Sequence, residues 1–86
     1  MEAERIQVGK VIHYFPKIGV AIIEISEGSI KIGNEIQIKG HTSDFTQKVE
    51  SMQIEHENVE IAIPGHVVAL KVKEPARAND LVIKSV

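Results

Sequence analysis

The sequence KGHTSDFTQKVESMQIEH, residues 39–56, mixes polar and apolar residues in a pattern that core packing alone does not explain. Gly40 ends an apolar run, and the Thr, Ser and Asp that follow are residues whose short side chains bond to nearby backbone amides. An extended pattern then resumes, so we predict a loop at 40–45 and a strand at 47–55, with a bulge or a boundary between faces near Ser51. The loop would project its polar and aromatic side chains from a rigid support.

The rest of the chain reads as further short strands separated by turns. Isoleucine and valine dominate the apolar residues and favour strands, and helical periodicity appears nowhere over a useful length. Gly33-Asn34 interrupts one strand, residues 57–60 form a polar connection, and Pro64-Gly65 suits the central positions of a type II turn. The predicted strands span residues 6–14, 18–25, 30–39, 47–55, 67–72 and 81–84. Six short strands favour a small closed or nearly closed barrel, because closure removes unpaired edges.

Three of these strands carry more detailed predictions. In the first, strict alternation places the even-numbered residues from Ile6 to Tyr14 on one face and the odd-numbered ones on the other. In the second, Ala21 to Ile23 is apolar at both parities, which suggests burial on both sides or a barrel corner. In the fifth, Val68, Leu70 and Val72 are expected to point inward.

Length and composition limit the classes of function. With 86 residues and no cysteine, the chain has the size of one domain, residues 1–86, and can form neither a disulfide nor a cysteine-based metal site. The net charge of −2 argues against a large cationic footprint for nucleic acid. No segment has the apolar length of a signal peptide or of a membrane-spanning helix. We expect a soluble, cytoplasmic protein with no membrane partner.

The loop and the residues beside it form the first candidate binding surface. In a structural interpretation, Thr42 and Asp44 cap the turn through backbone amides and Phe45 plugs one end of the barrel. In a functional interpretation, the aromatic ring offers stacking and the flanking lysines bind phosphate or carboxylate. Both interpretations stay open at this point. The candidate binding residues are Lys39, His41, Thr42, Asp44, Phe45, Gln47 and Lys48.

A second candidate contact lies at Tyr14-Phe15-Pro16-Lys17. Neighbouring residues on a strand point to opposite faces, so one of the two aromatic rings can fill the barrel while the other stays outside. The proline cannot donate to a ladder and ends the strand in a turn. Tyr14 and Lys17 are therefore added as candidate binding residues, against the alternative that a lone exposed aromatic residue carries no function.

The residues offer no constellation for catalysis. The four histidines have no short-range pairing such as His-x-x-x-His, and the chain lacks a Gly-x-x-x-x-Gly-Lys-Ser/Thr phosphate loop. Serine and threonine have histidine neighbours only in sequence, whereas a catalytic triad needs a base and an acid that converge across the fold. We therefore expect no enzyme activity, no metal, no cofactor and no nucleotide hydrolysis in this domain.

Several segments resemble the second domain of translational GTPases such as elongation factor Tu. They are Gly9 to Val11, Gly28 to Ile36, Val49 to Met52 and Ile63 to Leu70. The resemblance implies a six-stranded Greek-key β-barrel of the translation-factor domain 2 type, with tRNA or rRNA as a partner. Asn34 and His66 stand where that family usually has aspartate, and Asn79 stands where glycine is common. Asparagine tolerates the left-handed geometry of such positions.

A more specific resemblance is to the small C-terminal barrel of the collagenase-like peptidases, family U32, and to short proteins that resemble translation elongation factors. It rests on HYFPKIGVA at 13–21, KGHTSDFTQ at 39–47 and VESMQIEH at 49–56. In larger members of the family a separate catalytic domain precedes the barrel, and several relatives are implicated in modifying RNA bases. The resemblance therefore implies a catalytic protein domain as partner, in cis or in trans.

These observations predict a non-catalytic binding module that contacts RNA of the translation apparatus or a catalytic partner domain. One alternative is a C-terminal accessory domain that positions the substrate of a collagenase-like peptidase or of an RNA-modifying enzyme. A second alternative is a protein-interaction module with no RNA role. Fold does not fix function, so the choice of partner rests on analogy.

Overall fold

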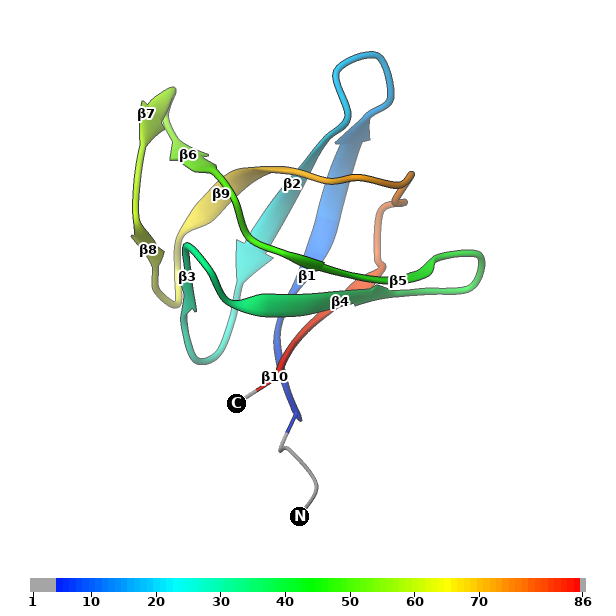
Figure 1. Ribbon diagram of the computed structural model, residues 1–86, viewed down its shortest axis with the longest axis horizontal. Helices are drawn as coiled ribbons and strands as arrows, with labels where there is room; N and C mark the ends of the chain where they lie inside the picture. The colour runs from blue at the N-terminus through cyan, green and yellow to red at the C-terminus, as the bar shows by residue number, and fades with distance from the viewer. Residues whose placement is uncertain (1–4, 86) are drawn as a thin grey trace.

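A computed structural model describes residues 5–85 of the chain (Figure 1). Its described residues form strands and turns and contain no helix, hence none long and apolar enough to cross a membrane. The strands are β1 (Arg5–Phe15), β2 (Val20–Ile25), β3 (Ile30–Lys31), β4 (Glu35–Lys39), β5 (Asp44–Lys48), β6 (Met52–Ile54), β7 (Glu57–Asn58), β8 (Ile61–Ala62), β9 (Val67–Lys71) and β10 (Leu81–Ser85). The prediction of a small all-β fold is confirmed. Residues 1–4 and 86, which the predicted domain includes, lie outside the described part.

Eight strands form one curved antiparallel sheet in the order β5-β4-β10-β1-β2-β9-β6-β7, and β3 pairs separately with β8. In Figure 1 the β4–β5 hairpin lies across the direction of β1 and β2, so that the sheet wraps around a shared interior. The backbone ladder begins at β5 and ends at β7. Within residues 5–85 it is therefore a curled sheet, and closure of the predicted six-stranded barrel is not confirmed. β7 lies where the sequence predicts a polar connection.

The interior is almost wholly aliphatic. Ile23, Ile38 and Leu70 are fully buried, and each such side chain contributes about 1.5–3 kcal/mol when it leaves water. The prediction that Val68, Leu70 and Val72 point inward is confirmed, because their exposed fractions are 0%, 0% and 6%. The core is thus formed by packing alone, as the absence of cysteine requires.

β1 departs from the predicted strict alternation. Its register shifts between Gln7 and Gly9 against β10, and between Val11 and His13 against β2. Each shift adds one residue to one strand and so exchanges its two faces. Val8 and Val11, which have opposite parity, are consequently both fully buried. The prediction that even- and odd-numbered residues occupy two separate faces throughout the strand was wrong, because a sequence period does not reveal where a bulge falls.

The predicted loop at 40–45 is shorter than expected. β5 already begins at Asp44, directly after a tight turn in which the Gly40 amide donates to the Ser43 carbonyl at 2.7 Å. The sequence reading missed this hairpin because the polar residues of the turn continue into the first residue of the strand. β4 and β5 pair over their full length.

The predicted strand at 47–55 is two strands. β5 ends at Lys48, and β6 begins at Met52 and pairs with β9 instead of β4. Between them the Val49 amide donates to the Asn34 carbonyl at 2.8 Å, and the side chain of Val49 is buried. The chain changes partner after this anchor, so the predicted change near Ser51 is a break between strands and not a bulge within one.

Two turns follow their sequence predictions. Gly65 has a φ of 94°, and the amide of His66 donates to the Ile63 carbonyl at 3.0 Å, which closes the turn that the proline-glycine pair predicts. Asn79 has a φ of 76°, the left-handed geometry expected where related sequences have glycine. These two turns set the directions in which the chain enters β9 and β10.

Candidate functional site

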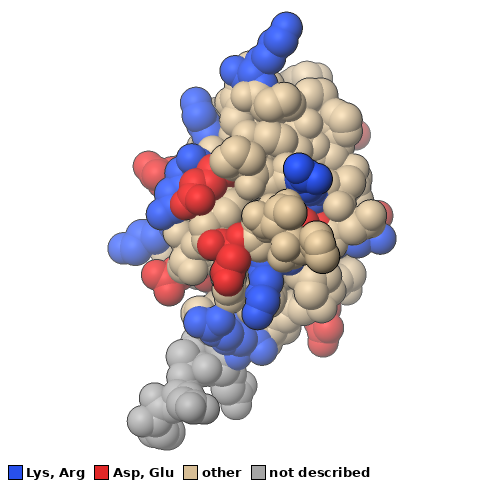
Figure 2. All heavy atoms as spheres, turned by 90° about the vertical axis from the view of Figure 1, so that its right-hand side faces the viewer, with Lys and Arg blue, Asp and Glu red and all other residues tan. Residues whose placement is uncertain are grey.

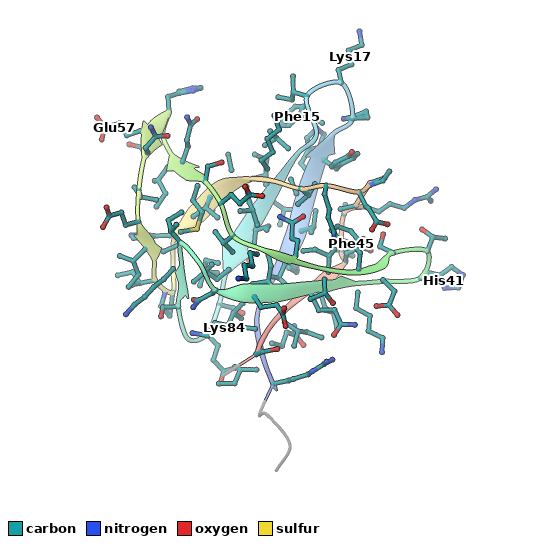
Figure 3. The ribbon with its side chains drawn as sticks, in the orientation of Figure 1. Phe15, Lys17, His41, Phe45, Glu57 and Lys84 are labelled. Atoms are coloured by element: carbon teal, nitrogen blue, oxygen red, sulfur yellow. The ribbon has the colours of Figure 1, made fainter. Side chains whose placement is uncertain are left out.

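The predicted recognition loop is the turn of the β4–β5 hairpin. His41 and Thr42 are exposed there, and Figure 3 shows His41 at the tip, pointing away from the rest of the protein. Lys39 lies opposite Asp44 beside this turn, whereas Lys48 lies at the other end of β5. The two lysines are therefore separated along the hairpin and do not form a single cationic cluster.

Phe45 and Asp44 are engaged within the domain. Phe45 is paired with Ile38, and only 6% of its surface is exposed. Figure 3 shows it on the side of β5 that faces the other strands, where no ligand can stack on it. This burial supports the structural interpretation of Phe45. Asp44 accepts a hydrogen bond from Nε2 of Gln37 at 2.8 Å, a contact along the sheet in place of the expected cap of the turn.

Gln47 is half-buried and bonded to the backbone that follows β9. Its Nε2 donates to the carbonyl of Lys71 at 2.9 Å, and its Oε1 accepts from the amide of Lys73 at 2.8 Å. Both ends of the side-chain amide are thus used inside the domain. This arrangement gives Gln47 a part in holding the sheet together.

A groove of about 620 Å³ brings together two of the predicted binding residues, Tyr14 and Thr42. It lies between the end of β1, the β4–β5 turn and the loop after β9. The lining residues are His13, Tyr14, Pro16, Thr42, Ser43, Pro75, Ala76, Arg77 and Ala78. Arg77 is the one full positive charge among them, and none of them is acidic. Lys17 lies apart from His41, at the tip of the β1–β2 hairpin (Figure 3).

The charges around the tip of the β4–β5 hairpin are mixed. Figure 2 looks onto this side of the molecule, where acidic and basic side chains are interspersed along one flank and a broad uncharged area lies above them. Phosphate backbones are bound by many lysine and arginine side chains acting together. The mixed flank is therefore not a phosphate-binding surface of that kind.

A second surface, which the sequence reading missed, covers the outer face of β2 and β9. Phe15, Ile18 and Val67 are 42%, 61% and 44% exposed. Three half-buried apolar side chains lie among them. We call this surface the outer patch; its members are Phe15, Ile18, Val20, Ile22, Val67 and Ala69. The signal for it was the run Ala21 to Ile23 in β2, which is apolar on both faces and which the sequence interpretation assigned to burial on both sides or to a barrel corner.

The β6–β7 turn borders the outer patch and has unusual backbone geometry. Glu55 and His56 have φ angles of 51° and 67°, a conformation that glycine and asparagine adopt more easily. His56 and Gln53 line two hollows together with Ile22 and Ala69, and the volumes of these hollows are about 350 and 190 Å³. The turn thus places a histidine at the rim of an apolar surface.

The remaining histidines serve local contacts. The ring of His13 lies edge-on to Phe15, with centroids 4.4 Å apart, and Nδ1 of His66 accepts from the amide of Ile63 at 3.2 Å. Within residues 5–85 no three His, Cys, Asp or Glu side chains group in a way that could hold a metal ion.

No protein-family model matches the chain. Among curated proteins it is 44% identical over 78 residues to a collagenase of Porphyromonas gingivalis, and 39% identical over 79 residues to an uncharacterized protease of Methanocaldococcus jannaschii. Each match covers about 90% of this chain but only 19% of the relative. The chain therefore spans about a fifth of the length of the curated relatives it matches.

The solved structures that resemble this chain also come from a peptidase. The C-terminal domain of a U32 peptidase from Geobacillus thermoleovorans matches with a TM-score of 0.83 at 25% identity, over 93% of this chain and 91% of that one. Its selenomethionine variant matches with the same TM-score at 26% identity, over 90% and 96% of the two chains. The homologues are collagenase-like peptidases and the structural neighbours are C-terminal domains, as the second resemblance predicts. The resemblance to translation factors stays a prediction.

Proposed function

We propose that this chain is the non-catalytic accessory domain of a collagenase-like U32 peptidase and that it holds the peptide substrate for a separate catalytic domain. The observation that carries the proposal is the match itself. Nine-tenths of this chain corresponds to a fifth of each protease relative, and the matching solved structures are C-terminal domains of a U32 peptidase. Such a domain contributes binding, and the chemistry belongs to the rest of the protein.

The described residues support a non-catalytic role. Ser43 and His13 line the same groove, but no hydrogen bond joins them, and no acidic side chain lines the groove to orient the histidine. A triad needs both of these contacts. The groove therefore lacks the means to activate a serine, although it offers hydroxyl groups for hydrogen bonding.

The groove suits an extended peptide. Its volume lies within the roughly 300–1,000 Å³ common for ligand clefts. Tyr14 provides an aromatic wall of the kind that binds polyproline II segments in other recognition domains, and Pro16 and Pro75 add apolar surface beside it. Collagen chains have this conformation, and the Porphyromonas gingivalis relatives are named collagenases. We infer a proline-rich, collagen-type peptide as the ligand of the groove.

RNA finds less support as a partner. The net charge is −2, and charges of both signs are interspersed on the flank in Figure 2. Lys39, Lys48 and Lys17 lie at separate places on two hairpins. The alternative of a protein-interaction module is supported by the outer patch, because three of its apolar side chains are exposed.

The test replaces the matching segment of the Porphyromonas gingivalis collagenase by this chain. Three forms are compared on a collagen-type peptide: the intact relative, the relative without the segment, and the chimera. We expect removal to raise KM more than it lowers kcat, since substrate binding is lost, and the chimera to restore it. Unchanged kinetics after removal, or cleavage of the peptide by this chain alone, would contradict the proposal.

A further inference from the structure

We propose that the outer patch is the surface on which the domain docks against the catalytic domain of the same protein. This inference rests on the proposed accessory function and assigns it a second, separate surface. The groove would hold substrate, and the outer patch would fix the domain in place beside the catalytic centre.

Strand pairing makes the outer patch continuous. Phe15 pairs with Val20 across β1 and β2, and Ile22 pairs with Ala69 across β2 and β9. Directly opposed residues lie on the same face of a sheet, so these side chains form adjacent rows. Ile18 lines the same hollow as Phe15 and Ile22, and Val67 lies two residues along β9 from Ala69. The apolar side chains therefore form one surface.

The outer faces of β4 and β5 differ from this one. On β4 and β5 the more exposed positions are polar or charged: Glu35, Gln37, Lys39, Asp44, Thr46 and Lys48. A sheet with one solvated face normally alternates apolar inside with polar outside. On the outer side, Val20 and Ile22 of β2 and Val67 and Ala69 of β9 break this rule. Glu24, which lies opposite Val67, follows it. A contiguous apolar area of this kind on a domain surface marks a contact with another protein surface.

The rim of the outer patch has the mixed character of an interface between domains. Gln53, His56 and Lys71 border the apolar side chains. The turn that carries His56 holds two successive non-glycine residues at positive φ, a conformation that costs free energy unless its surroundings maintain it. Strain of this kind is concentrated at binding and switch regions, and here it lies at the edge of the proposed contact.

The partner that covers the outer patch is the catalytic domain and not a second copy of this chain, because the related proteins are much longer than this domain. In the curated relatives about four-fifths of the chain lies outside the segment that matches this domain. A tethered neighbour acts at high effective concentration, so a patch of modest area is enough to dock it. Interfaces between domains of one chain bury roughly 600–1,500 Å² and are more polar than obligate dimer interfaces. An apolar centre with a rim of Gln, His and Lys fits this description.

A connected domain can reach the outer patch. Arg5 pairs with Ser85, so both described ends lie at the same end of β1. Val67 pairs with Glu24, which in turn pairs with Lys10, five residues along β1 from Arg5. At about 3.3 Å per residue this is roughly 17 Å, a distance that a folded neighbour joined near Arg5 spans easily.

The experiment measures binding in trans, because the related Geobacillus domain was crystallised as a domain on its own and this chain forms its own core. The probe is the Porphyromonas gingivalis collagenase without the segment that matches this chain. Calorimetric titration compares the native chain with Ile18→Asp and Val67→Lys, which place a charge at either end of the outer patch. Ile32→Asp is the matched control, because Ile32 is 42% exposed but lies outside the outer patch. Circular dichroism verifies that each variant is folded.

We expect the native chain and Ile32→Asp to bind equally, and each patch variant to bind at least tenfold more weakly. Equal binding by the patch variants would overturn the docking inference. No binding by the native chain, together with an active chimera, would also overturn it while leaving the accessory function in place. If the chimera is inactive as well, both proposals fail. A dimer of the native chain that Ile18→Asp dissociates, without binding to the probe, would assign the outer patch to a second copy instead.

Discussion

The side chain of Gln47 accepts a hydrogen bond from the backbone amide of Lys73 at 2.8 Å across the gap between β5 and the chain that leaves β9. Its other end donates to the carbonyl of Lys71 at 2.9 Å. A peptide group of a neighbouring strand would make the same pair of bonds. One side chain therefore links two parts of the sheet that no backbone ladder joins within residues 5–85.

Replacing Gln47 by alanine is expected to destabilise the domain. The change leaves the Lys73 amide and the Lys71 carbonyl without their partner, and each such loss costs about 1–3 kcal/mol when the group is shielded from water. Gln47 is only half-buried, so we expect a total near 2 kcal/mol in the free energy of unfolding, measured by urea denaturation. Gln53→Ala, which removes an exposed contact to Asn58, is the control and should change it by less than about 0.5 kcal/mol. Equal effects of the two changes would argue against the bridging role of Gln47.

Gly40→Ala is expected to destabilise the β4–β5 turn through Asp80. A methyl group at Gly40 would clash with Oδ1 of Asp80. Asp80 is 4% exposed, and its other carboxylate oxygen, Oδ2, accepts from the Arg77 amide at 2.9 Å. The carboxylate has little room to move, so we expect the free energy of unfolding, measured by thermal unfolding, to fall by about 1–3 kcal/mol. Asp80→Ala in the same chain should recover part of this loss, whereas the isosteric Asp80→Asn should not. Simple additivity of Gly40→Ala and Asp80→Ala would refute the steric explanation.

Replacing Glu55-His56 by Asn-Gly is expected to stabilise the β6–β7 hairpin. Asparagine and glycine adopt the positive φ of these two positions more easily, so the unfolding free energy should rise by roughly 1 kcal/mol. The same change removes the imidazole from the rim of the outer patch. Under the docking inference, the Asn-Gly variant should therefore bind the catalytic domain more weakly than the native chain, although it is more stable. Lower stability of the Asn-Gly variant would show that other contacts relieve the strain of the turn.

Thr42→Trp is expected to abolish peptide binding in the groove. Thr42 is an exposed groove residue, and an indole there would occupy space that the ligand needs. Thr46→Trp places the same side chain on an exposed position of the same hairpin outside the groove and should bind normally. A proline-rich peptide of collagen type, titrated by NMR, reports both affinities, and a tenfold or greater difference is expected. If both variants bind the peptide as the native chain does, the groove is not its site.

The sequence was sufficient to predict the fold class because each strand carries its own local pattern. Val68, Leu70 and Val72 alternate cleanly and lie inward, and Asn79 adopts the left-handed geometry that its place before Asp80 predicts. The two register shifts of β1 were beyond prediction, since a bulge is decided by the neighbouring strands and not by the bulged sequence.

The candidate site was only partly predictable for a related reason. Tyr14 and Thr42 were identified from their residue types, but Arg77 and Pro75 reach the same groove from a loop more than thirty residues further along the chain. The outer patch was missed because an apolar residue on a strand has the same appearance in sequence whether it faces a core or a partner. Gln47 was taken for a contact residue because its backbone partners, Lys71 and Lys73, lie far away in sequence.

The pairing of Arg5 with Ser85 has a consequence for how the domain forms during synthesis. β1 is the first of these ten strands to be synthesised, yet one of its edges is completed only by β10, the last of the ten. The nascent chain therefore exposes an unpaired apolar strand until almost the entire domain has been translated, and such edges promote association between chains. Non-local strand pairs also form slowly, because a long loop must close before any contact compensates for the lost entropy. Chaperone binding during translation should therefore persist until β10 emerges.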